Sequence, residues 1–137
     1  MPTPIEIVIG KVTLQAELND SPAAKAIAAR LPFELRMSRW GDEYYGGCGV
    51  DAPLAADARD LMEVGELAYW PPGKALCIFF GRTPVSCGDE PRAASEVNPV
   101  GRVSGDLAPL QALGASIRPL IRKRETPAGA TSQQRKP

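Results

Sequence analysis

The run ALCIFF at residues 75–80 is the feature that most narrows the folds open to this chain. All six of its residues are apolar, which is typical of a strand buried on both faces. A Pro-Pro-Gly-Lys turn at 71–74 precedes it, and Tyr69 and Trp70 precede the turn. Half of the eight aromatic residues of the chain therefore lie within residues 69–81. They serve either as core or as the wall of a ligand site, and the run alone leaves both interpretations open.

Strict alternation of apolar and polar residues recurs around this run, as half-buried strands require. Residues 5–18 predict a hairpin, and residues 33–40 predict a further strand. Residues 22–31 are rich in alanine and follow capping side chains, which predicts a helix. We expect one face of the 75–80 strand to fill the interior of a barrel and the other face to lie under this helix.

The remaining segments complete a fold of short strands. Residues 41–53 are rich in glycine and predict a loop or a heavily bulged hairpin, and residues 81–96 predict a long loop. The stretch 97–103 predicts a strand broken at its proline, at a sheet edge or a bulge. A short helix at 106–113 and a last strand at 115–124 follow. Because strands and helices do not alternate, the chain is expected to be a mainly β barrel or sandwich.

Composition predicts one cytoplasmic domain with a charged end. The chain has 137 residues, 44% of them hydrophobic and 23% charged, and no apolar run approaches the roughly eighteen residues of a membrane span. No secretory leader is recognised, and three cysteines without metal-site spacing predict free thiols. The net charge is zero, but residues 115–137 hold six basic groups and one acid. We expect residues 123–137 to be a disordered, solvated basic tail and not a nucleic-acid site, because no aromatics interleave its charges.

The chain has no histidine, which excludes several classes of enzyme. Ser-His-Asp and Cys-His nucleophile systems and histidine-containing zinc sites cannot be built. A phosphate-binding loop ending in Gly73-Lys74 also fails, because Ala68 and Ala75 stand where that motif needs glycine and serine or threonine. We therefore expect neither a metal nor a cofactor.

The string YWPPGKALCIFFGRTP at residues 69–84 is long and specific. Together with LPFELRMSRWGDEYY before it and PRAASEVNPVGRV after it, it resembles a small, largely uncharacterised family of bacterial and archaeal proteins with a cyclophilin-like fold. The resemblance implies a closed antiparallel cyclophilin-like β-barrel with two short capping helices over residues 1–122. It does not imply isomerase activity, because peptidyl-prolyl isomerases of that superfamily carry a Phe-His-Arg segment and this chain lacks histidine.

The leading hypothesis is a barrel that binds a small molecule or an extended peptide at an aromatic rim. Rings with polar edges suit such a groove, whereas Phe79 and Phe80 are expected in the core. The predicted ligand-binding residues are Trp40, Tyr45, Tyr69, Trp70, Arg39, Arg82, Thr83 and Ser86.

Each polar member of this set also has a simpler interpretation. The arginines suit surface ion pairs, and Thr83 and Ser86 suit loop backbone groups. The alternative function is a peptidyl-prolyl isomerase with a noncanonical site, in which Arg39 or Arg82 donates to the prolyl nitrogen. A third possibility is an accessory subunit whose barrel edge meets a protein partner. Whether the chain is an enzyme stays open, as does its oligomeric state.

Overall fold

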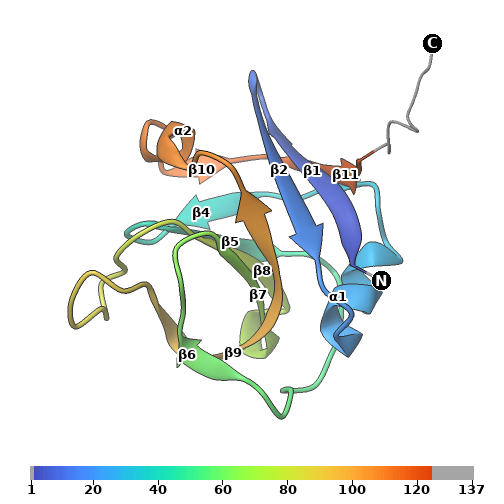
Figure 1. Cartoon of the computed structure of the whole chain (residues 1–137), viewed down its shortest axis with the longest axis horizontal. Coiled ribbons are helices and arrows are strands. Elements are labelled where there is room, and N and C mark those ends of the chain that lie inside the picture. The colour runs from blue at the N-terminus through green and yellow to red at the C-terminus, as the bar shows by residue number, and fades with distance from the viewer. Residues whose placement is uncertain (1, 125–137) are drawn as a thin grey trace.

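The computed structural model describes residues 2–124, and Figure 1 shows them as a strongly curved sheet with short helices at its edges. The predicted basic tail lies outside the described residues from position 125 onward. The helices are α1 (Pro22–Ala28) and α2 (Ala108–Gln111), with one 3₁₀ turn η1 (Pro71–Gly73). The strands are β1 (Thr3–Ile9), β2 (Val12–Leu18), β3 (Phe33–Glu34), β4 (Met37–Arg39), β5 (Glu43–Gly47), β6 (Arg59–Leu61), β7 (Glu66–Trp70), β8 (Ala75–Phe79), β9 (Arg92–Ser104), β10 (Ser116–Ile117) and β11 (Leu120–Lys123).

The strands form one antiparallel sheet, which confirms the mainly β class. Their order is β10-β4-β5-β8-β7-β9-β2-β1-β11-β3, and β6 pairs with β9 beside this path. The path has separate ends at β10 and β3, so the predicted closed barrel is not confirmed. The last predicted strand, residues 115–124, is interrupted between β10 and β11. Pro119 lies in this gap, and it has no N–H to donate to a neighbouring strand. No helix within residues 2–124 has the length and apolar character of a membrane span.

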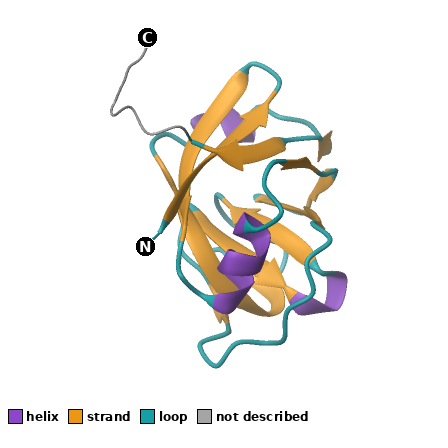
Figure 2. Cartoon of the chain, turned by 90° about the vertical axis from the view of Figure 1, so that its right-hand side faces the viewer, coloured by secondary structure: helices purple, strands orange, loops and turns teal. Residues whose placement is uncertain are grey.

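The predicted hairpin and helix are present. Strands β1 and β2 pair along their whole length and turn at Gly10, whose φ of +57° suits glycine. Helix α1 starts at a Ser21 cap that accepts the N–H of Ala24. It ends at Ala28 and does not reach residue 31, because Pro32 disfavours helical backbone geometry in the residue that precedes it. Figure 2 shows α1 lying against the rolled sheet, where it packs on β2 and β9.

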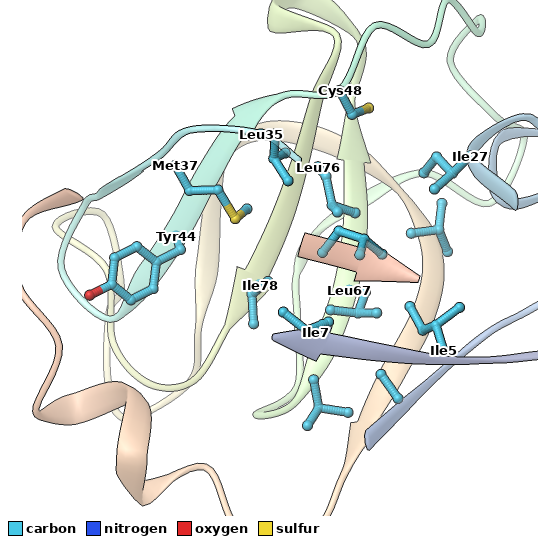
Figure 3. Packing of buried hydrophobic residues seen from close by; sticks show 14 of the residues in the cluster. Ile5, Ile7, Ile27, Leu35, Met37, Tyr44, Cys48, Leu67, Leu76 and Ile78 are labelled. Atoms are coloured by element: carbon cyan, nitrogen blue, oxygen red, sulfur yellow. The ribbon is translucent and has the colours of Figure 1, made fainter. Parts of the chain in front are cut away.

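The main core lies on the inner face of the sheet (Figure 3). It includes Ile5 and Ile7 of β1, Leu67 of β7, and Leu76 and Ile78 of β8, all buried. Helix α1 adds three buried apolar side chains to this same cluster, Ala23, Ala24 and Ile27. The helix therefore caps the interior.

The outer face of β8 is covered by other elements than predicted. Cys77 and Phe79 alternate with the core residues of β8 and pack in a second cluster with Met62, Ala93 and Val97. The cover thus comes from the segment after β6 and from β9, and the expectation that α1 lies there is wrong. Strand β9 begins at Arg92, inside the segment predicted as a loop.

A bend in β9 explains this arrangement. Its first residues pair with β6, and its later residues pair with β7 and β2. The register against β7 shifts between Leu67 and Ala68, opposite Gly101 and Pro99. Such an irregularity bends a strand, and this one stands at the proline where a break was predicted. The first half of β9 is thereby carried over the outer face of β7 and β8.

Candidate functional site

A pocket of about 270 Å³ lies on the outer face of the sheet, beside the second cluster. Strands β5, β7 and β8 contribute to it, together with the first half of β9 and the turn before β5. The lining residues are Trp40, Glu43, Tyr45, Trp70, Cys77, Ala93, Ala94 and Val97. Alternation along β5 places Glu43 and Tyr45 on this face, whereas Tyr44 between them packs in the main core.

Three aromatic side chains border the pocket. Trp40 and Trp70 are half-buried, and Tyr45 is 37% exposed. The indole N–H of Trp70 donates to the Ser95 hydroxyl at 2.7 Å. The turn η1 folds back under the same ring, and a Cβ on Gly73 would lie only 2.8 Å from it. The Pro-Pro-Gly turn therefore holds Trp70 in place, with its polar edge occupied by Ser95.

Glu43 is the polar group of the buried part of the pocket. Its backbone closes the turn from β4, since the N–H groups of Trp40 and Glu43 donate to each other's carbonyl oxygens at 2.8 and 3.2 Å. Glu43 is only 5% exposed, and its Oε1 atom has no hydrogen-bond partner among the described residues. Burial raises the pKa of the Glu43 carboxyl to about 7, an effect that the neighbouring Cys77 thiol partly offsets. Near neutral pH this carboxyl is therefore divided between its two protonation states.

Glu66 shows what a paired carboxylate in this protein looks like. It is as buried as Glu43, but Arg59 contacts both of its oxygens, at 2.9 and 2.6 Å. The N–H of Glu63 donates to it as well, at 2.8 Å. Burial acts to raise the pKa of Glu66, yet the hydrogen bonds from Arg59 and Glu63 together bring it below its ordinary value. Glu43 lacks such a cationic partner: the Cys77 thiol interacts with its carboxyl, and its Oε1 atom has no hydrogen-bond partner among the described residues.

The rest of the lining carries little charge. No lysine or arginine belongs to it. Cys77 is fully enclosed, and burial places the pKa of its thiol well above the ordinary value, so it is a neutral side chain and no nucleophile. The residues from 2 to 124 contain no cluster of three or more histidine, cysteine or acidic side chains able to hold a metal ion. The arrangement therefore offers ring faces, an apolar floor and one ionisable carboxyl.

Arg39 lies apart from the pocket lining. Its guanidinium donates to the carbonyl oxygens of Leu113 at 2.9 Å and Gln111 at 3.2 Å, and to the Asp42 carboxylate at 3.0 Å. It also lies 5.1 Å from the centre of the Phe80 ring. Arg39 therefore anchors the end of α2 to the turn after β4.

Arg82, Thr83 and Ser86 also lie outside the pocket lining. Arg82 is exposed, and its carbonyl oxygen accepts the N–H of Asp42 at 2.7 Å. The Ser86 hydroxyl accepts the Thr83 N–H at 2.9 Å, and the Thr83 hydroxyl donates to the carbonyl of Arg92. Arg82, Thr83 and Ser86 thus form hydrogen bonds that satisfy backbone groups of this loop and its neighbours.

Tyr69 does not border the pocket, contrary to our expectation. It is fully buried in the main core, where its hydroxyl donates to the Val50 carbonyl at 2.6 Å and accepts the Ala52 N–H at 3.2 Å. The reason is the alternation of β7, because consecutive residues of a strand point to opposite faces and Trp70 points to the pocket. Phe79 and Phe80 are buried, which confirms them as core.

The structure brings three of the predicted aromatic residues together and adds members that sequence reasoning missed. Glu43 is the most important of these, and the signal for it was its position two residues before Tyr45 on the same face of a strand. Cys77 shares that face across the ladder, opposite Tyr45. The three β9 residues, Ala93, Ala94 and Val97, had no local signal, because only the bend of β9 brings them to the pocket.

The chain is similar to a family of proteins and to a protein of known structure. A family model described as Cyclophilin-like matches residues 3–118. A hypothetical protein from Archaeoglobus fulgidus, known from its solution structure, is 32% identical to this chain and has a TM-score of 0.76. The match covers 90% of this chain and 95% of that protein. No functionally curated protein matches the chain at a significant level.

Proposed function

The chain belongs to the cyclophilin-like family, and from that premise we propose that it binds a small molecule in the pocket bordered by Trp40, Tyr45 and Trp70. The observation that carries this proposal is the buried Oε1 of Glu43, which has no partner among residues 2–124. An unsatisfied buried polar group costs about 1–3 kcal/mol. A ligand that pairs with this oxygen would recover that cost, and an unpaired polar atom in an apolar pocket is a feature of binding sites.

The size of the pocket favours a small compound over an extended peptide. Its volume of about 270 Å³ lies just below the range of roughly 300–1,000 Å³ that is common for drug-sized ligands. Aromatic side chains supply a large contact area with defined ring geometry, and the buried Ala93 and Val97 of β9, with the exposed Ala94 beside them, complete an apolar wall.

The proposal includes closure of the sheet into a barrel. Closure would hold the turn that carries Trp40 in a fixed position at the pocket. Two pairings support it, Ser116 with Ser38 and Leu120 with Glu34, which belong to one continuous register. Between them the N–H of Leu35 donates to the Pro119 carbonyl at 3.2 Å. Strands β3 and β4 would then act as one interrupted strand that joins both ends of the sheet. Strong protection of the Leu35 amide from hydrogen exchange would support closure, and exchange at the rate of a frayed edge would contradict it.

The isomerase alternative has no comparable support. Rotation about a prolyl bond needs a donor aimed at the prolyl nitrogen, and the Arg39 guanidinium donates to carbonyl oxygens at the end of α2 and to Asp42. Arg82 is exposed and lies outside the pocket lining. We therefore keep isomerase activity as an outcome to be tested by exchange NMR on an Ala-Pro peptide.

Native mass spectrometry of the gently purified protein tests the proposal, together with a fragment screen by NMR that follows the two indole N–H signals. We expect a retained compound, or fragments that shift both signals. Ala94 is an exposed residue of the lining, so Ala94→Phe places a large ring at the edge of the pocket, where it should fill the opening and abolish these effects. Ala112→Phe, an equally exposed change at the end of α2, should preserve them. Binding that persists in the filled variant would show that the compound binds elsewhere.

A further inference from the structure

We propose that this pocket selects a small organic cation of the alkylated-ammonium type, held between the aromatic rings and the Glu43 carboxylate. This inference rests on the proposed function and specifies its ligand class. It follows from the combination of two tryptophans, one tyrosine and one buried carboxyl in a lining without basic groups.

The first argument concerns charge. Glu43 is the only carboxyl in the lining. Two arginines are direct chain neighbours of lining residues, and both form ion pairs with residues outside the lining. Arg39, next to Trp40, pairs with Asp42. Arg92, next to Ala93, contacts Asp60 at 3.2 Å and Glu90 at 3.6 Å. An anion would therefore meet a carboxylate with no counter-charge, whereas a cation supplies the partner that Oε1 lacks.

The second argument concerns shape and polarity. A cation within roughly 6 Å of an aromatic ring centre is attracted to the ring face, and tryptophan attracts it best. The Trp70 N–H already donates to Ser95, so what Trp70 offers a ligand is its ring. Alkyl groups on an ammonium suit such walls and remove N–H donors that would otherwise need acceptors. The pocket supplies few acceptors, which favours an alkylated ammonium over a primary one.

Two rival occupants fit less well. A hard metal ion needs six or more oxygen ligands, and the residues from 2 to 124 hold no cluster of three or more acidic, cysteine or histidine side chains. A neutral compound that donates one hydrogen bond to Oε1 would satisfy that atom but would leave the carboxylate charge without a counter-ion. This neutral compound is the rival that the experiment must separate from a cation.

Protonation of Glu43 makes the inference measurable. The groups that face Glu43 are the Cys77 thiol from β8 and the Tyr45 phenol from its own strand, whereas the lining residues of β7 and β9 do not titrate. Burial raises the pKa of Glu43 to about 7, so at lower pH a bound cation has to displace a proton. With about 1% of the carboxyl ionised at about pH 5, the apparent Kd there should be about 100-fold weaker than its plateau above about pH 8.

The test compares choline with 3,3-dimethyl-1-butanol, a neutral alcohol of the same shape in which carbon replaces the charged nitrogen. Tryptophan fluorescence and calorimetry would follow binding by the full chain. At about pH 8 we expect choline to bind at least about tenfold more tightly than the alcohol, and only choline to weaken toward acid. The variant Glu43→Gln should lose the pH dependence and most of the preference for choline, leaving only the smaller preference that the aromatic rings give to a cation. The comparison of the two compounds on the unaltered protein needs no variant.

The outcomes separate this inference from the proposed function. Equal binding of choline and the alcohol would overturn the cation inference while the pocket keeps its binding role. Preferential choline binding that is independent of pH, or that Glu43→Gln leaves at its full size, would overturn the assignment to Glu43. If neither compound binds while a neutral compound co-purifies in the pocket, the cation inference fails alone. A peptide with trimethyllysine that binds more tightly than free trimethyllysine would contradict a free small molecule as the occupant.

Discussion

Replacing Glu43 by glutamine should change how the stability of the protein depends on pH. The pKa of Glu43 is raised from 4.5 to about 7 in the folded protein. The folded state therefore keeps a proton that the unfolded state loses between these two values. Each pH unit in this window lowers the free energy of unfolding by about 1.4 kcal/mol, so the total loss approaches about 3 kcal/mol. The stability from the protonated form is complete below about pH 4.5 and lost once the pH has passed about 7.

The Glu43→Gln variant lacks this loss, because glutamine does not titrate. Urea unfolding followed by tryptophan fluorescence, at intervals from about pH 4 to about pH 8, gives the free energy of unfolding of both proteins. The difference between them should grow in favour of the variant through the window and then stay constant. Other carboxylates, including Glu66, contribute alike to both proteins and cancel. Parallel curves would refute the reasoning, because they would mean that Glu43 titrates as in the unfolded chain.

Glu96→Gln is the matched control, since it makes the same chemical change on an exposed residue of β9. Its stability curve should run parallel to that of the unaltered protein. A curve like that of Glu43→Gln would mean that the effect arises from net charge and not from burial.

Three further substitutions test other contacts. Arg59→Ala should leave Glu66 buried without its ion pair and lower the free energy of unfolding near neutral pH by about 1–3 kcal/mol, with a smaller loss in acid where Glu66 takes up a proton; an unchanged urea midpoint would contradict this pairing. Gly73→Ala should displace the Trp70 ring, shift its fluorescence and weaken pocket binding; an unaltered emission spectrum would argue against that contact. Tyr69→Phe should lower the free energy of unfolding, measured in urea, by about 1–3 kcal/mol, because it removes a buried hydroxyl and leaves its partners unpaired. Loss of pocket binding in this variant would contradict the placement of Tyr69 in the core.

Local patterns predicted the elements whose sequence either alternates strictly in polarity or is apolar throughout. The alternation in residues 5–18 gave the hairpin, and the uninterrupted apolar run gave β8 with both faces buried. The position of the cover over β8 could not be predicted in this way. It depends on a bend in β9 around Pro99, and the sequence of 92–97 has neither a strand period nor a helix period that would place it over a distant strand.

The candidate site was predictable only in part. Trp40, Tyr45 and Trp70 were identified because large rings near turns are candidates for a pocket wall. Alternation along a strand separates Tyr69 from Trp70, but it does not decide which of the two lies at the pocket. Glu43 was not among the predicted ligand-binding residues. Its burial depends on the β9 residues packed over it, which lie about fifty positions away in the chain.

The strict alternation of β8 has a consequence for how this fold can change over time. Leu76 and Ile78 pack in the main core, while Cys77 between them packs in the second cluster and lines the outer pocket. A substitution at position 77 can therefore change the surface of the pocket without altering the contacts that its two neighbours make in the main core. A library that varies only position 77, among side chains of similar size, should yield folded proteins whose pocket surfaces differ.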